Sequence, residues 1–453
     1  MALLTAIVPN FSAIPIISTT IFVICLATGA LLLSSLYART NSEAIAFSGI
    51  LIASPIWLHI GEFNTLSWGV GIGLLATCVA IRFVLTPRPL AVLLAGLLAA
   101  FALSVYQSLI VVYAIVCVTA LVGSNPFWQI PILESETIGR SRLLLNIIAS
   151  MLFAAIAYVA IQFMAVKIAH VQMGYVENFI QPRAFLNDFF GTTKRVISRI
   201  QGLLVGSDPT FLGWGRAVLF PAWLGVAAGL AGLVTSRRYS WPLRATSILA
   251  FIAIIVGAAG LIIASAGQIP TRALVGFPLI YALLGLSGFR AISRPRWISW
   301  SVLAYSIFIC AWTSTSLFYL DQLVRQRDQV TAEHLIYEIK SVAGTNQDAA
   351  IPITVVGELH YEDTFEGHPS NIEIFGTSFF QQDGGNIYRI ASYLRLLGLS
   401  HLQPVPIENV RDRLPAIDQM PKWPTPGSVA NLNGIIVIKL GPLSYQQQLA
   451  LEK

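Results

Sequence analysis

Charged residues are scarce in this chain. They make up 11% of the 453 residues, and apolar residues make up 55%. A typical soluble domain has about 25% charged residues, so the composition excludes an ordinary soluble enzyme, a disordered chain and a nucleic-acid-binding protein. The charges are also unevenly spread: residues 1–320 hold 18 Lys and Arg against 7 Asp and Glu, whereas residues 321–453 hold 10 against 15. A basic first part therefore precedes a mildly acidic tail.

Cysteine is equally scarce, and closely spaced cysteine pairs are missing. The four cysteines each lie in an apolar run, and no CxxC pair occurs. This pattern argues against a disulfide framework and against a zinc site. GxSxG, HExxH, Walker and GxGxxG motifs are also missing from any usable context. We therefore expect no metal and no cofactor.

Long apolar runs fill residues 1–320. A helix needs about 20 apolar residues to cross the hydrocarbon core of a bilayer. Backbone groups in lipid must be satisfied within their own segment, so such runs are helices. The sequence therefore predicts an all-α polytopic membrane domain with about ten transmembrane helices. The predicted segments are roughly 14–37, 44–60, 65–85, 90–105, 107–123, 143–166, 214–235, 245–266, 272–290 and 297–320.

Arginine indicates how these segments are oriented. Alternation of the spans places four basic loops on one side of the membrane, and the excess of arginine identifies that side as cytoplasmic. The loop 167–212 and the tail 321–453 then lie on the extracytoplasmic side. The basic loops carry Arg82, Arg88, Arg140, Arg142, Arg237, Arg238, Arg244, Arg290, Arg294 and Arg296.

The tail, residues 321–453, reads as a small α/β domain. It begins with an amphipathic helix, in which Leu323, Val330, Leu335, Ile336 and Ile339 recur at helical spacing. Strands are predicted at 353–357, 372–375 and 435–439, and a helix at 386–397. The proline-rich segment 415–426 is expected to be an irregular connection.

The outer loop 167–212 contains an amphipathic helix. Its apolar positions are Phe189, Phe190, Val196, Ile197, Ile200, Leu203 and Leu204, and its polar positions are Lys194, Arg195, Ser198 and Arg199. Such a basic helix is typical of one that lies in the headgroup plane. Its cations can hold the phosphate of a lipid-linked substrate through charge-assisted hydrogen bonds. Generic attraction to anionic lipid is the alternative.

Three further positions on the outer side are candidates for a site. Arg272 is the lone charge of a short outer loop, which suggests an anionic ligand or an ion pair with Glu62 or an outer Asp. Glu62 lies in a short turn between two spans, where a carboxylate often marks function; an interfacial residue is the alternative. Tyr106 and Gln107 can bind sugar hydroxyls, or Tyr106 can belong to the aromatic belt.

Several segments together resemble a known family. They are Glu62–Trp68, Ala102-Leu-Ser-Val-Tyr-Gln107, Pro270-Thr-Arg-Ala-Leu274, and Gly385-Asn-Ile-Tyr-Arg389 followed by Leu397-Gly398. On these segments the chain resembles, over nearly its whole length, the type II O-antigen glucosyltransferases. These are polytopic, GT-C-like membrane glycosyltransferases.

The resemblance implies an activity and a location. Glucose, or another hexose, would pass from a polyprenyl-phosphate-linked donor to a lipid-linked or surface glycan such as the O-antigen of lipopolysaccharide. The reaction would take place on the periplasmic face of a bacterial inner membrane, and the tail would be periplasmic. Arg272, Lys194, Arg195 and Arg199 would then bind the donor phosphate, and Tyr106 and Gln107 the sugar. Glu62 or Asp188 would be the carboxylate that activates the acceptor hydroxyl.

One departure from the family leaves other functions open. Such enzymes carry a preceding span and an acidic first outer loop, and this chain begins after that point. That departure favours a non-catalytic, truncated remnant.

A transporter or flippase for a lipid-linked saccharide is the other alternative. It predicts charged or broken helices at the midplane and related halves, whereas the spans here are nearly uncharged and the halves show no evident similarity.

Overall fold

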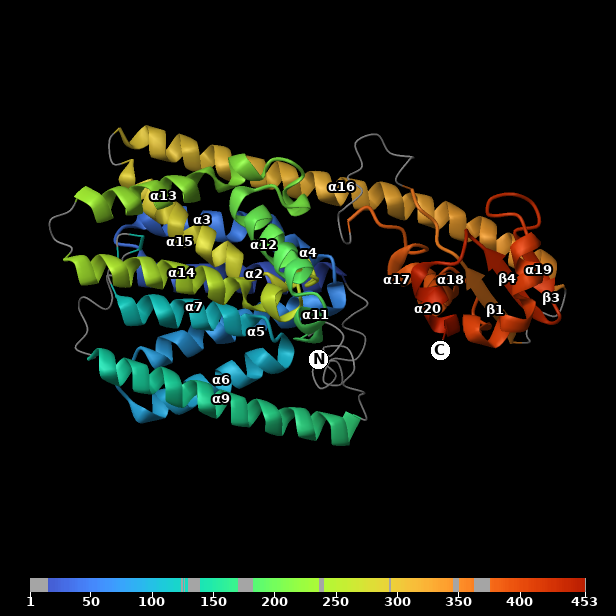
Figure 1. Ribbon diagram of the computed structural model, residues 1–453, viewed down its shortest axis with the longest axis horizontal. Coiled ribbons are helices and arrows are strands. Elements are labelled where there is room, and N and C mark those ends of the chain that lie inside the picture. Colours follow the sequence, from blue (N-terminus) through green and yellow to red (C-terminus); the bar gives the residue numbers. More distant parts are fainter. Residues whose placement is uncertain are drawn as a thin grey trace. The chain divides into compact units, whose positions relative to one another are not determined.

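The computed structural model divides the chain into two compact units, Met1–Ser314 and Thr315–Lys453. It describes residues 15–123, 125, 127–128, 139–169, 182–235, 240–292, 295–344, 350–361 and 375–452. The described part of the first unit is helical, and the axes of most of its helices are roughly parallel to one another (Figure 1). Its elements are α2 (Pro15–Tyr37), α3 (Asn41–Ala53), η2 (Pro55–Trp57), α4 (Leu58–Gly61), α5 (Asn64–Val84), α6 (Pro89–Val105), α7 (Leu109–Val122), α9 (Arg140–Ala169), α11 (Pro182–Asn187), α12 (Phe189–Val205), η3 (Pro209–Phe211), α13 (Gly215–Thr235), α14 (Trp241–Ala264), η4 (Thr271–Ala273), α15 (Gly276–Ala291) and the start of α16 (Arg296–Ala343).

Many of these helices are suited to a membrane. Among the described residues, six are long and apolar enough to cross one, and α3 with η2 and α4 forms a seventh candidate, bent by 45°. The remaining predicted segments correspond to the shorter apolar helices α6, α7 and α15, which have 17, 14 and 16 residues. A straight span needs about 20 residues. The structure thus supports a polytopic membrane protein, while the count of ten spans stays a prediction.

The bend between α3 and α4 has a local cause. Pro55 follows Ser54, whose backbone has left the helical region (ψ 126°). The residue before a proline is pushed out of the α conformation, which ends α3 there. A short 3₁₀ turn, η2, then leads into α4, and Glu62 directly follows α4.

Two helices extend beyond their predicted ends. α9 ends at Ala169, against a predicted end near residue 166. The tenth segment and the amphipathic helix of the tail, expected as separate elements, form the single 48-residue helix α16. No Gly or Pro occurs between Arg296 and Ala343, and these are the residues that interrupt helices. Hydropathy falls near residue 320, but nothing there stops the helix.

The second unit contains a four-stranded sheet. Its strands are β1 (Ile351–Val356), β2 (Leu402–Pro404), β3 (Val429–Leu432) and β4 (Ile435–Lys439), in the order β2-β1-β4-β3. β1 is parallel to β2 and β4, and β3 and β4 form an antiparallel hairpin. The helical elements after β1 are α17 (Gln382–Gly385), α18 (Ile387–Leu396), η5 (Ile407–Arg413), α19 (Leu414–Gln419) and α20 (Tyr445–Glu452).

The core of this unit shows which predictions about the tail hold. β1, β4 and α18 occupy the predicted positions, and α19 forms inside the segment expected to be irregular. The buried residues of α16 include Leu335 and Ile339, which join a cluster with β1 and α18. Val330, expected on the same face, is 53% exposed. The predicted strand 372–375 lies, except for its last residue, outside the described residues.

Candidate functional site

The helix α12 forms the wall of the candidate site. Asp188 caps its start by accepting a hydrogen bond from the Gly191 N–H (2.9 Å), and Gly206 ends it with a left-handed backbone (φ 82°). Glycine adopts this conformation without steric cost. α12 packs against α11, α13 and α14, and it crosses them near the end of the first unit where α4 lies (Figure 1).

The apolar residues of α12 do not share one environment, contrary to the prediction of a single apolar face. Val196 and Leu203 are buried in the bundle, whereas Phe189, Phe190 and Ile197 are 60%, 85% and 57% exposed. One edge of the helix therefore packs against protein and another carries exposed aromatic and aliphatic side chains. Such exposed residues suit contact with lipid, in keeping with the predicted interfacial position.

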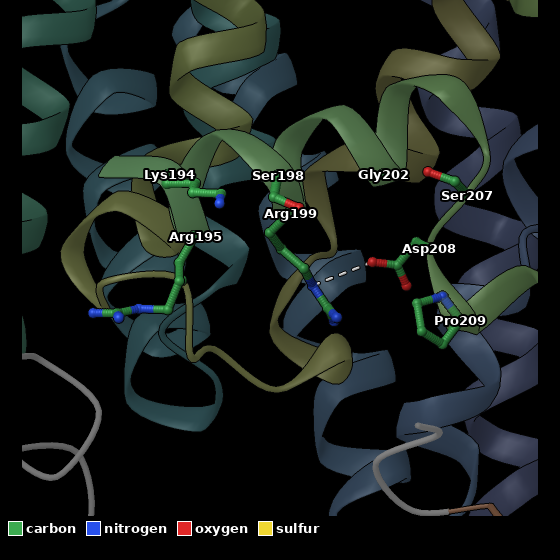
Figure 2. A pocket seen from close by; sticks show the side chains of 9 residues that line it. Lys194, Arg195, Ser198, Arg199, Gly202, Ser207, Asp208 and Pro209 are labelled. Atoms are coloured by element: carbon green, nitrogen blue, oxygen red, sulfur yellow. Dashed lines mark ion pairs between the residues drawn. The ribbon is translucent and has the colours of Figure 1, made fainter. Parts of the chain in front are cut away.

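The polar side of α12 lines a pocket of about 450 Å³. Figure 2 shows its cationic side chains, Lys194, Arg195 and Arg199, coming from α12, and Asp208 facing Arg199 from the segment after the helix. Three of the four predicted phosphate-binding residues thus line one cavity. The remaining lining residues are Ser198, Gly202, Ser207, Pro209 and Gly267.

Arg199 is the most firmly held of these cations. Its Nε lies 3.3 Å from Asp208 Oδ2, and the two side chains are 20% and 2% exposed. Its Nη2 also donates to Thr271 Oγ1 at 2.9 Å. Asp208 Oδ1 in turn accepts from the Thr210 N–H (3.1 Å) and hydroxyl (2.5 Å). These contacts fix the guanidinium at the pocket wall.

Lys194 and Arg195 are more exposed. Arg195 donates to Thr192 Oγ1 at 2.9 Å and lies 3.9 Å from Asp188, at side-chain exposures of 48% and 58%. Ion pairs this exposed contribute about 0–1 kcal/mol to stability. The geometry therefore leaves both cations able to turn toward an anionic ligand.

Arg272 belongs to the short element η4, which Arg199 contacts at Thr271. It follows Thr271, the residue that Arg199 contacts, and its guanidinium carbon lies 4.7 Å from the centroid of the Phe63 ring. α4 packs directly against η4. The fold thus places the fourth predicted phosphate-binding residue directly after the threonine that Arg199 contacts, although Arg272 itself does not line the pocket.

The two predicted catalytic carboxylates occupy different settings. Glu62 follows α4 as its C-cap residue, is half-buried and does not line the pocket. Asp188 is exposed and caps α12, and it does not line the pocket. Asp208 was not predicted as a site residue, yet it is the carboxylate that lines the pocket. Its signal in the sequence is Asp208-Pro-Thr210, in which the Asp caps the next helical turn.

Tyr106 and Gln107 lie at the turn between α6 and α7. The Gln107 side chain donates to the Tyr158 hydroxyl of α9 at 2.5 Å, and Gln162 donates to the same oxygen at 3.1 Å. Tyr106 packs against the helical core as the C-cap of α6. The structure does not bring either residue to the pocket lining, so their role as sugar-binding residues stays a prediction.

Comparison with known proteins assigns a family to most of the chain. No curated protein and no solved structure matches significantly. A family model described as glucosyl transferase GtrII matches residues 3–289, a range that includes α4, α12, η3 and η4. This match covers more than half of the sequence and confirms the expected family, but it ends before the tail, so the resemblance of the tail stays a prediction. The chain therefore belongs to the glucosyl transferase GtrII family.

Proposed function

We propose that the protein transfers glucose, or another hexose, from a polyprenyl-phosphate-linked donor to a lipid-linked or surface glycan such as O-antigen. The observation that carries this proposal is the pocket in which three cations, Lys194, Arg195 and Arg199, line one wall, and Arg199 also contacts Thr271, the residue before Arg272. The exposed apolar residues of α12 support a position at the membrane surface, where the phosphate of a lipid-linked sugar lies. A family of glucosyl transferases fits this chemistry.

The reaction needs positive charge at the phosphate. When the acceptor hydroxyl attacks the anomeric carbon, the bond from that carbon to the phosphate oxygen breaks and its electron pair stays on the polyprenyl phosphate. Fixed cations stabilise the charge that develops on this leaving group. Arg199, held by Asp208 and Thr271, is positioned for that role without reorganising. Lys194 and Arg195 supplement it.

The proton of the acceptor hydroxyl must go to a base. Asp208 is engaged by Arg199 and Thr210, so it serves as a positioning residue for Arg199. Asp188 caps α12 and is exposed. We assign the role of base to Glu62 because it directly follows α4, the helix that packs against η4, and η4 carries Arg272.

We further propose that the reaction takes place on the periplasmic face of a bacterial inner membrane. The arginine asymmetry of the short loops supports a position for α12, η4 and the C-terminal unit on the side opposite the basic loops. A polyprenyl-phosphate sugar presented on that face would reach the pocket from the lipid through the exposed edge of α12.

The test uses membranes that contain the protein, radiolabelled polyprenyl-phosphate-glucose and a lipid-linked O-antigen acceptor. We expect label in the acceptor glycan, and inhibition by sugar-free polyprenyl phosphate because it keeps the phosphate that the pocket binds. Label transferred from a nucleotide-linked glucose instead would overturn the donor assignment. Movement of the labelled lipid across the bilayer without covalent transfer would favour the flippase alternative.

A further inference from the structure

The C-terminal unit has a second pocket with the opposite chemical character. It has a volume of about 310 Å³ and lies between α16 and the segment 423–428. Two aromatic residues, Tyr337 and Trp423, line it together with His334, Glu338 and Thr425. Its lining, taken over the part of the chain that the structure describes, includes no Lys or Arg, whereas three cations line the first pocket.

The helix supplies one wall of this pocket. His334, Tyr337 and Glu338 are spaced three and four residues apart, so they share one face of α16. The neighbouring residues Leu335 and Ile339 are buried in the core of the unit, on the other side of the helix. Tyr337 is 73% exposed. The core thus fixes the helix, and the polar and aromatic face remains accessible.

The opposite wall is anchored to the sheet. The backbone N–H of Trp423 donates to the Lys439 carbonyl at 2.8 Å, and the backbone N–H of Lys439 donates to the Ser428 carbonyl at 2.9 Å. The Lys439 ammonium also donates to the carbonyl of Met420 at 2.7 Å. Trp423 packs against the core while lining the pocket. Both walls are therefore preorganised, which lowers the entropic cost of binding a ligand.

We infer that this pocket is a binding site for a neutral saccharide. Pyranose rings offer apolar C–H faces, which aromatic side chains cover, and hydroxyl groups that carboxylates, imidazoles and hydroxyls bind. Tyr337 and Trp423 supply the first kind of contact, and Glu338, His334 and Thr425 the second. A phosphate or a uronic acid finds no cation there and meets the carboxylate of Glu338. The volume lies near the lower end of small-molecule sites, about 300–1,000 Å³, which suits a mono- or disaccharide unit.

The identity of the natural ligand as the acceptor glycan rests on the proposed function, whereas saccharide binding itself does not. In that setting the pocket would hold a sugar of the acceptor chain outside the reacting centre. Binding of a remote part of a substrate lowers KM when it acts equally on the ground state and the transition state. Loss of the pocket is then expected to raise the KM for the acceptor and leave kcat unchanged.

The test is saturation-transfer NMR on the full-length protein in lipid nanodiscs, with maltotriose and a rhamnose-containing trisaccharide as neutral probes. With the wild-type protein, we expect saturation transfer to the trisaccharides. In Tyr337→Ala, we expect their affinity to fall about tenfold, equivalent to about 1.4 kcal/mol. Tyr337→Phe should bind nearly as well as wild type because it keeps the ring. Tyr445→Ala is the matched control, since Tyr445 is 71% exposed in the same unit and does not line the pocket.

Three outcomes would overturn the inference. The first is no saturation transfer to either trisaccharide, and the second is equal affinity of Tyr337→Ala and Tyr445→Ala for the trisaccharides. The third is preferential binding of tetramethylammonium or a proline-rich peptide in the same assay. Glucose transfer measured in the same preparation keeps the two proposals apart. Glucose transfer without trisaccharide binding contradicts only the saccharide pocket. Trisaccharide binding without glucose transfer contradicts only the proposed enzyme activity.

Discussion

Arg199 and Asp208 form a largely buried ion pair across the end of α12, with Nε 3.3 Å from Oδ2. Asp208 is almost fully buried, whereas Arg199 is 20% exposed and lines the pocket, so removing Asp208 leaves a partly solvated guanidinium without its carboxylate partner. The pair also aims the guanidinium at Thr271, next to Arg272. The hydrogen bond from Arg199 to Thr271 therefore links the helix of the pocket to the short element that carries Arg272, another predicted phosphate-binding residue.

We expect Asp208→Ala to lower the thermal stability of the detergent-solubilised protein clearly more than Asp188→Ala does. Asp208→Ala removes the carboxylate partner of Arg199, a residue that is itself largely buried, whereas Asp188 is 58% exposed and contributes mainly a helix cap. Loss of a cap costs about 1 kcal/mol. The measurement is the unfolding midpoint of both variants in the same detergent. Equal midpoints would contradict the view of Asp208 as the buried anchor of Arg199.

The cations of α12 could be predicted from the sequence, but their contacts could not. By sequence alone, Lys194, Arg195 and Arg199 are equivalent basic groups on one face of a helix. The structure separates Arg199, because Asp208 and Thr271 reach it from segments distant in sequence. Pairings of that kind depend on the packing of η3 and η4 against η2 and α4, which no local pattern reveals.

In the C-terminal unit the limit of sequence reasoning is different. β1 and β4 are apolar runs and are visible as strands, whereas β2 has three residues and too short a pattern to detect. β3 was missed although Asn433-Gly434 follows it, with φ of 52° and 86°. Asn-Gly between apolar segments is the strongest short-range signal of a hairpin, so this strand was predictable.

Glu62→Gln should abolish glucose transfer, and Asp188→Asn should retain it. Glutamine cannot take up the proton of the acceptor hydroxyl, whereas asparagine caps helices about as well as aspartate. The comparison is made by initial rates at matched protein abundance in membranes. Full activity of Glu62→Gln together with loss in Asp188→Asn would transfer the role of base to Asp188.

Membrane topology gives a further prediction. A reporter fused after Lys453 should be active only in the periplasm, and one fused after Arg238 only in the cytoplasm. The reason is the concentration of arginine in four loops on one side of the predicted spans. Paired alkaline phosphatase and fluorescent protein fusions at each position provide the measurement. Finding both positions on the same side would contradict the model of ten spans.

Arg272→Ala should lower glucose transfer by one to two decades, and Arg244→Ala should leave it nearly unchanged. Arg272 lies beside Thr271 and Arg199, whereas Arg244 lies in the first turn of α14, on the side predicted to be cytoplasmic. A hydrogen bond to a charged group contributes about 1.5–3 kcal/mol, and each decade in rate corresponds to about 1.36 kcal/mol. Arg272→Lys should restore activity only in part, because an ammonium lacks the bidentate fork of a guanidinium. Rates measured at matched membrane abundance decide the matter: wild-type activity in Arg272→Ala would remove this residue from the donor site and leave its stacking on Phe63 as a structural contact.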